Sequence, residues 1–211
     1  LSSHATLTAF GEGLADWEAM RESALRNPRV SAAAPFVEAE TLLIADHAAG
    51  TSSAATLRGI DPTLEAQVSA LGERLTKGSM RSLQPGSLTV LLGEELANKL
   101  GVGLGDAVVV AVAKGNVTPA GVLPRLRRFQ VAGTFRSGMY EIDATLAVVH
   151  VADAARLLRL GANVTGLRLA VKDPYEAPLA VREVANELGG GLYVEDWTQR
   201  NANFFRSIEL T

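Results

Sequence analysis

The sequence contains no cysteine among its 211 residues. Disulfide bonds, thiolate metal sites and cysteine nucleophiles are therefore excluded, whereas the compartment stays open because exported domains can also lack cysteine. Only three histidines occur, and His4, His47 and His150 stand far apart in the sequence, which argues against a zinc site. No run of 18 or more apolar residues is present, so no membrane-spanning helix is expected in this stretch of chain.

Charge is also sparse. Charged residues make up 20% of the chain, hydrophobic residues make up 47%, and the formal net charge is −3. This composition is typical of a globular protein with a substantial core. The weak negative charge argues against a nucleic-acid partner or an acidic membrane surface, so any basic function has to be local.

The common nucleotide-binding and hydrolase motifs are missing as well. The chain has neither a P-loop, Gly-x4-Gly-Lys-Ser/Thr, nor a Gly-x-Ser-x-Gly elbow. The stretch "GVGLGD", residues 101–106, lacks the Gly-x-Gly-x-x-Gly spacing and follows a helical pattern. A helix cap at Gly101 followed by a turn is therefore favoured over a phosphate site, and no cofactor is expected.

Two pairs of carboxylates, Glu38 with Glu40 and Glu94 with Glu95, remain as candidates for acid–base chemistry. On a helix, Glu94 and Glu95 point about 100° apart, which favours a solvated surface over a shared substrate. A hydrolase that uses these carboxylates stays open as an alternative. It requires a deep polar pocket with perturbed acids.

The order of expected elements predicts an α+β fold. The first and last thirds of the chain each read as strand, helix, strand, while the middle third is richer in strands and glycine. The simplest architecture is a split α/β domain formed by residues 1–60 and 162–211, with a β-rich domain formed by residues 61–161 inserted between its halves. In the inserted part, residues 153–161 predict a helix that Asp153 caps and Gly161 ends.

The stretch "KGNVTPAGVLPRLRRFQVAG", residues 114–133, follows a strand-like segment at 107–113 and overlaps another at 127–135. It predicts a stiff projecting loop, since Pro119 and Pro124 restrict the backbone and Gly121 permits a bend. Such a loop would lose little entropy when it binds a partner. A long hairpin with a solvated basic base is the alternative.

The side chains of this loop divide into an apolar tip and a basic base. Val122 and Leu123 place apolar groups near the tip, and Arg125, Arg127 and Arg128 place charge at the base. Arginine makes planar, multi-donor contacts with carboxylates, which favours an acidic partner surface. The residues alone leave recognition and the solvated hairpin equally open.

Several stretches together resemble the LolC/LolE family, the membrane subunits of the bacterial lipoprotein-releasing ABC transporter. They run in the family's order through nearly the whole chain. These stretches are "LRGIDP" (57–62), "VLLGEELANKLGVGLGD" (90–106), "TPAGVLPRLRRFQVAGTF" (118–135), "SGMYEIDATLAVVHVADAARLL" (137–158) and "VTGLRLAVKDP" (164–174). Residues 196–210 look like the approach to a following transmembrane helix.

The resemblance implies an exported domain held between the first two transmembrane helices of an inner-membrane protein, at its periplasmic face. It also implies a Porter-like α/β part, as in MacB-type transporters, and an inserted Sabre-like part with a protruding hook at residues 114–129. In LolC-type members the hook captures the periplasmic lipoprotein chaperone LolA. The hook pattern T-P-x-G-x-x-P-x-x-R-x-F falls on Thr118, Pro119, Gly121, Pro124, Arg127 and Phe129.

The partner-binding residues implied in this way are Thr118, Pro119, Gly121, Val122, Leu123, Pro124, Arg125, Arg127, Arg128 and Phe129. One position departs from the family: LolC-type members can carry a basic residue on the strand before the hook, where this chain has Val109. Arg125 or Arg128 is expected to supply that charge instead.

The resemblance further implies a domain without catalytic activity that helps hand lipoprotein cargo to LolA. A LolD-type ATPase subunit would hydrolyse ATP, and a LolE-type paralogue or a second copy of the same subunit would complete the transporter. The periplasmic domain of another MacB- or FtsX-like transporter, with a different adaptor or cargo, is the alternative within this architecture.

Overall fold

The computed structural model describes residues 3–200, including all their side chains except those of residues 114–117 and 200. The chain forms two compact units. The first unit comprises Leu1–Phe36, Thr63–Ser69 and Ala162–Thr211, and the second comprises Val37–Pro62 and Ala70–Gly161. No helix in the described part of the chain is long and apolar enough to cross a membrane.

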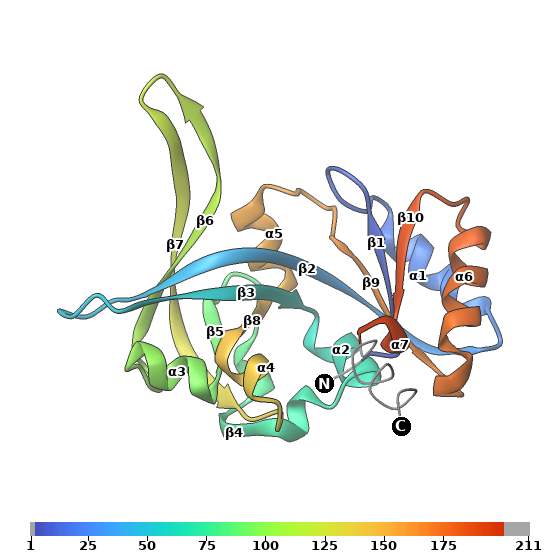
Figure 1. The fold of residues 1–211 in the computed structure, drawn as a ribbon, viewed down its shortest axis with the longest axis horizontal. Helices are drawn as coiled ribbons and strands as arrows, with labels where there is room; N and C mark the ends of the chain where they lie inside the picture. The colour runs from blue at the N-terminus through green and yellow to red at the C-terminus, as the bar shows by residue number, and fades with distance from the viewer. Residues whose placement is uncertain (1–2, 201–211) are drawn as a thin grey trace, which may run out of the picture. The chain divides into compact units, whose positions relative to one another are not determined.

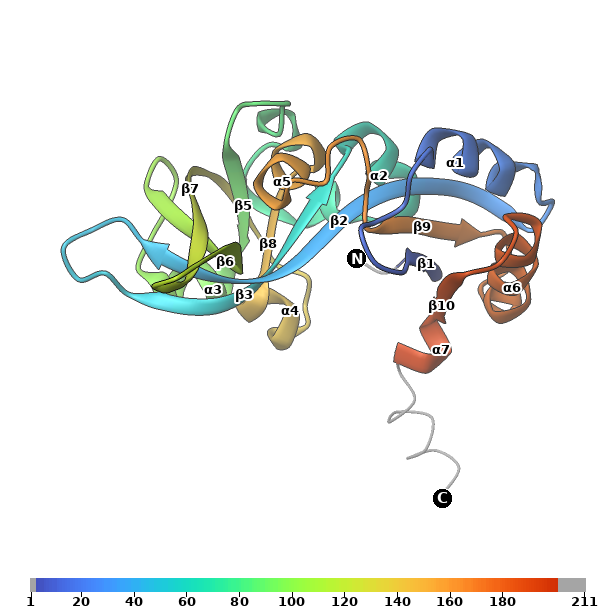
Figure 2. The ribbon, with the colours of Figure 1, turned by 90° about the horizontal axis from the view of Figure 1, so that it is seen from above.

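The first unit is an antiparallel sheet with helices packed on it (Figures 1 and 2). Its strand order is β10 (Leu192–Asp196), β1 (Ala5–Ala9), β9 (Gly166–Val171) and the first half of β2 (Val30–Ala45). Helix α1 (Trp17–Arg26) contacts β9, and α6 (Ala177–Glu187) contacts all three short strands. The expected strand–helix–strand order at both ends of the chain is confirmed by β1–α1–β2 and β9–α6–β10.

In the second unit six strands close into a ring. Going round the ring, the order is β2, β3, β8, β5, β7, β6 and back to β2. The five further strands are β3 (Ser52–Ile60), β5 (Thr89–Gly93), β6 (Ala107–Thr118), β7 (Gly121–Phe135) and β8 (Leu146–His150). Each strand contributes at least one side chain with no more than 1% exposure: Leu43, Leu57, Val148, Val90, Phe129 and Val110. This ring is the core that supports the candidate site.

Short elements connect and flank these strands. The helices are α2 (Pro62–Val68), α3 (Glu94–Leu100), α4 (Tyr140–Thr145), α5 (Val151–Leu158) and α7 (Trp197–Arg200). Strand β4 (Leu75–Gly78) pairs with β7 beside β5, and single 3-10 turns occupy Leu71–Arg74, Met80–Ser82 and Pro174–Glu176.

The domain boundary expected near residue 60 differs from the boundary in the structure, because the second half of β2 and all of β3 belong to the second unit. Residues 37–60, assigned from the sequence to the split domain, belong to the second unit, and Thr63–Ser69 belongs to the first. The reason is the length of β2, which has 16 residues. Its residues 30–36 pair with β9, whereas residues 41–45 pair with β6. One continuous strand thus serves both units, and no turn signal marks the change.

A buried ion pair holds α2 within the first unit. Arg168 Nη1 on β9 bonds to Glu65 Oε1 on α2, and both side chains are almost completely buried. Ser69 Oγ donates to the same Glu65 oxygen at 2.8 Å, and Arg168 Nε donates to Ser3 Oγ at 3.3 Å. Since burying either charge alone is costly, each group depends on the other to remain in the core.

We expect Arg168→Met to destabilise the domain by about 3 kcal/mol, because the Glu65 carboxylate would stay buried without its counter-charge. The double variant Glu65→Leu/Arg168→Met should lose much less. Glu176→Gln, which removes a partner of the partly exposed pair Arg29–Glu176, serves as the control. Urea unfolding measures all three, and equal losses in the single and double variants would contradict the assignment.

Candidate functional site

The predicted hook is a β-hairpin. Strands β6 and β7 pair antiparallel as far as Val117 opposite Val122 and Thr118 opposite Gly121. Only Pro119 and Ala120 form the turn, so the segment is a paired hairpin rather than the expected long loop. Gly121 has φ 118°, a value that favours glycine, and Thr118 Oγ1 donates to its carbonyl at 2.8 Å. The pattern Thr-Pro-x-Gly is thus the signature of a tight turn.

Pro124 lies inside β7, where its missing N–H would normally interrupt the ladder. The register accommodates it: Val112 pairs with Arg125 and Asn116 with Leu123, so residues 113–115 of β6 lie opposite Pro124. A bulge of this kind leaves unpaired backbone on one strand and increases the local twist. The proline therefore sits at the one irregularity of the hairpin rather than in a loop.

Among the strands of residues 3–200, none other lies beside the outer half of the hairpin. Strand β2 pairs with β6 only at residues 108–112, and β5 pairs with β7 only from Gln130 onward. Figure 1 shows β6 and β7 continuing together as a two-stranded ribbon. Val122, Leu123 and Leu126 are 57%, 61% and 57% exposed. The expectation of exposed apolar groups near the tip is confirmed.

Alternation along β7 separates the residues that the sequence had grouped together. Phe129 is 1% exposed and belongs to the core of the ring, so its assignment as a partner contact is wrong. Arg128 faces the opposite side, where its Nε bonds to Asp46 Oδ2 at 2.7 Å. The three arginines therefore do not form one patch, because their β-strand spacing places Arg128 apart from Arg125 and Arg127.

Arg128 lies directly opposite Val109 on the neighbouring strand. It therefore stands beside the position where LolC-type members can carry a basic residue. Of the two replacements expected from the sequence, the register favours Arg128 over Arg125, which alternation directs to the other face.

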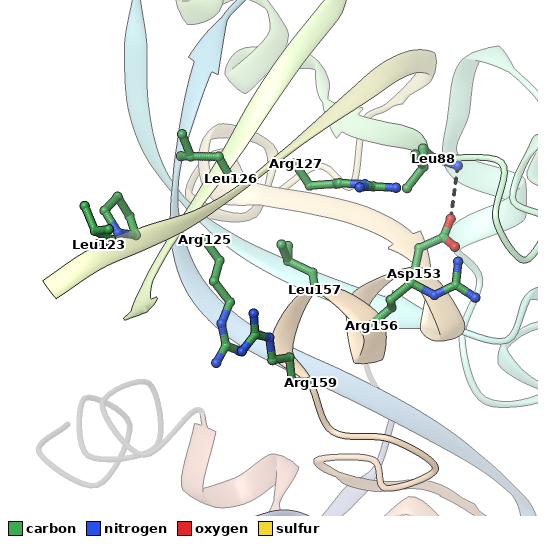
Figure 3. A pocket seen from close by; sticks show the side chains of 10 residues that line it. Leu88, Leu123, Arg125, Leu126, Arg127, Asp153, Arg156, Leu157 and Arg159 are labelled. Carbon is green, nitrogen blue, oxygen red and sulfur yellow. Dashed lines mark hydrogen bonds between the residues drawn. The ribbon is translucent and has the colours of Figure 1, made fainter. Parts of the chain in front are cut away.

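Arg125 and Arg127 line a groove of about 390 Å³ between β7 and α5 (Figure 3). In Figure 3 Arg125 and Arg159 point toward one another, while Leu126 points away from both. The groove is lined by Leu88, Leu123, Pro124, Arg125, Leu126, Arg127, Asp153, Arg156, Leu157 and Arg159. Sequence reasoning missed the contribution of Arg156 and Arg159, because residues 153–161 predicted only a helix and no local signal links them to the hairpin.

Helix α5 is capped by His150 rather than by Asp153, which corrects the prediction. His150 Nδ1 accepts from the backbone N–H of Ala152 at 3.0 Å. Asp153 instead accepts from the N–H groups of Gly86 and Leu88, at 2.7 and 3.1 Å. The helix ends at Leu158, with Arg159 in the left-handed region at φ 55°, so Gly161 is not its stop. Asp153 thereby ties the wall of the groove to residues 86–88.

The other sequence candidates have structural roles. Gly101 closes α3 in the left-handed conformation, and its N–H donates to the carbonyls of Ala97 and Asn98, which confirms the helix cap. Among the carboxylates, Glu38 pairs with Arg58 and Glu94 with Arg136. Within the described residues no group of three or more histidine, aspartate or glutamate side chains could hold a metal ion.

Comparison with known proteins assigns the class. Residues 3–187 match the family of MacB-like periplasmic core domains. In solved structures, the periplasmic region of MacB from Actinobacillus actinomycetemcomitans superposes with a TM-score of 0.59 at 14% identity, covering 98% of this chain and 92% of that one. The extracellular domain of the Gram-positive transporter YknZ gives 0.57 at 12% identity, covering 90% and 98%. The chain belongs to the MacB-like periplasmic core domain family and has its mixed α/β fold.

Within this class the chain is similar to LolC proteins over its whole length. It is 41% identical over 210 residues to the lipoprotein-releasing system transmembrane protein LolC of Xylella fastidiosa, and 36% identical over 211 residues to that of Neisseria meningitidis. Each match covers 100% of this chain and 50% of the relative. The chain thus spans about half the length of these curated relatives. The resemblance to the LolC/LolE family is confirmed.

The cap on α5 predicts a pH-dependent stability. Burial lowers the pKa of His150 below its ordinary value of 6.5, although Asp153 and Asp61 act in the opposite direction. The unfolded chain therefore binds the proton more readily, so this contribution to stability is present above pH 6.5 and is lost as the pH falls through the folded pKa. His150→Asn keeps a capping acceptor but cannot titrate.

Thermal unfolding of both proteins between pH 7.5 and 5 should show a smaller loss of stability in His150→Asn. His4, whose pKa burial also lowers, remains in both proteins and contributes equally. Parallel pH profiles would contradict the role given to His150.

Truncating a buried and an exposed side chain of β7 should change the free energy of unfolding by very different amounts. Phe129→Ala should cost about 3–5 kcal/mol, since it opens a cavity in the ring. Leu126→Ala, three residues away on the exposed part of the hairpin, should stay within about 0.5 kcal/mol of wild type. Chemical denaturation of the two variants checks the difference, and comparable losses would show that Phe129 is not a core residue.

Proposed function

We propose that this domain is the periplasmic part of an inner-membrane subunit of a lipoprotein-releasing ABC transporter, and that its β6–β7 hairpin docks the chaperone LolA. The observation that carries the proposal is a two-stranded ribbon with exposed apolar residues, in a chain similar to LolC throughout. The domain performs no chemistry of its own. A separate LolD-type subunit hydrolyses ATP, and a LolE-type paralogue or a second copy completes the membrane part.

Two properties suit the hairpin to docking. Its backbone is already paired at residues 116–118 and again at residues 107–112, so binding orders little additional chain. Among the described side chains, Val122 and Leu123 are the large exposed apolar groups nearest the turn, and they would enter an apolar groove of LolA. Arg125 and Arg127 would pair with acidic groups at the rim of that groove. Thr118, Pro119, Gly121 and Pro124 then hold the shape of the hairpin.

In this proposal the two units correspond to the Porter-like and Sabre-like parts of MacB-type transporters, with the hairpin as the hook of the second. Lipoprotein released from the inner membrane passes to LolA while LolA is held at the hairpin. The domain would therefore hold LolA where lipoprotein is released, and ATP hydrolysis in another subunit would supply the energy for the transfer.

Truncation of the apolar tip tests the proposal. Val122→Ala/Leu123→Ala should weaken LolA binding by about 2 kcal/mol or more, whereas Arg127→Gln should cost less and lose its effect at high salt. Leu104→Ala, which removes another exposed apolar side chain of the second unit, should leave the affinity unchanged. Calorimetric titration with LolA from the same organism measures each constant.

Replacing residues 118–124 by a two-residue turn provides the stringent control. The proposal is wrong if that replacement binds LolA as well as wild type does, or if wild type does not bind LolA. In the second case, co-purification with a different adaptor would point to another MacB- or FtsX-like transporter.

A further inference from the structure

We propose that the docking surface continues from the hairpin into the groove between β7 and α5, where Arg125, Arg156 and Arg159 bind carboxylates of an acidic segment of the docked protein. The inference rests on the proposed function, since the docked protein is taken to be LolA. It adds a second contact region, on helix α5, that the hairpin residues do not include.

The charge in the groove is unbalanced. Four arginines line it and only one acid, Asp153. Both carboxylate oxygens of Asp153 already accept backbone N–H groups, from Gly86 and Leu88. The groove therefore retains an excess of positive charge, which an acidic segment can neutralise.

Within the described residues, two arginines of the groove lack the carboxylate partner that five other arginines have. Arg29, Arg58, Arg128, Arg136 and Arg168 each form an ion pair with a carboxylate. Among the side chains that the structure describes, neither Arg125 nor Arg156 has such a partner. Two guanidinium groups without a carboxylate partner in the described part of the chain therefore lie in one groove, where carboxylates of a ligand can pair with them.

Arg125 supplies the most specific observation. Its Nε is buried and has no hydrogen-bond partner within the described part of the chain. A buried donor without an acceptor is costly, so the site gains free energy when an incoming oxygen accepts from it. Figure 3 shows Arg159, the residue that follows α5, approaching Arg125, which directs a second guanidinium to the same place. Two planar donors converging in this way match a carboxylate.

The groove also has a lining and a position that suit a short peptide segment. Leu157 of α5 is 8% exposed and contributes to its lining, and Leu123 at the same groove is 61% exposed. Its wall on β7 includes Leu123, Arg125 and Arg127, which belong to the proposed hairpin surface. A protein held on the hairpin would therefore place its neighbouring chain at the groove, and this continuity favours a protein carboxylate over a lipid phosphate.

The test uses Arg156→Gln/Arg159→Gln, which changes α5 and the residue that follows it and leaves the hairpin intact. The matched control is Lys77→Gln/Lys99→Gln, which removes two exposed positive charges from β4 and α3 of the same unit. LolA binding at about 50 mM salt should weaken about tenfold in the groove variant and less than twofold in the control. The dependence of affinity on salt should also become shallower only in the groove variant.

Three outcomes separate the possibilities. Equal affinities of the groove variant and its control overturn the inference, and the hairpin proposal stands if the tip variants still lose binding. If wild type does not bind LolA, the proposed function itself fails. If only binding to phosphatidylglycerol vesicles depends on the two arginines, the occupant is a lipid phosphate and the inference is wrong. Arg156→Gln alone, with Lys99→Gln as control, repeats the test if the double variant unfolds.

Discussion

Phe129 lies in the core of the second unit close to the point where β6 and β7 leave their other neighbours, and the candidate docking surface depends on this packing. Within the ring, β2 and β5 supply the outer hydrogen bonds of the two strands. Beyond the ring, β6 and β7 form backbone hydrogen bonds only with each other among the described strands. An isolated two-stranded hairpin is marginal in water, so the buried base has to hold the exposed tip in place.

The arginines also differ between those that stabilise the fold and those that line the candidate docking surface. Where arginine and carboxylate stabilise the fold, they are paired, as in the buried contact of Arg168 with Glu65 and the exposed contact of Arg128 with Asp46. Between β7 and α5 the arginines outnumber the acids. An excess of cations contributes little to folding, and its presence beside an exposed apolar hairpin is the combination expected of a surface that binds an acidic protein.

Local patterns in the sequence predicted much of the fold. The strand–helix–strand order at both ends and the cap at Gly101 depend on neighbouring residues, and both are confirmed. Residues 114–133 were expected to form a stiff loop because Pro119 and Pro124 restrict the backbone and Gly121 permits a bend. The structure instead continues β7 through Pro124, with a bulge of β6 opposite it. Likewise, β2 crosses from one unit to the other without any local signal, because only its pairing partners change.

The sequence by itself determined the family, the exposed apolar tip at Val122 and Leu123, and the absence of cysteine chemistry. Only the tertiary structure decided which side each basic residue faces. Successive side chains of a β-strand point to opposite faces. Arg128 therefore pairs with Asp46, away from Arg125 and Arg127, and Phe129 packs in the core. Arg125, in contrast, meets Arg156 and Arg159 in one groove although they stand about 30 residues apart in the sequence, because the ring brings β7 and α5 together.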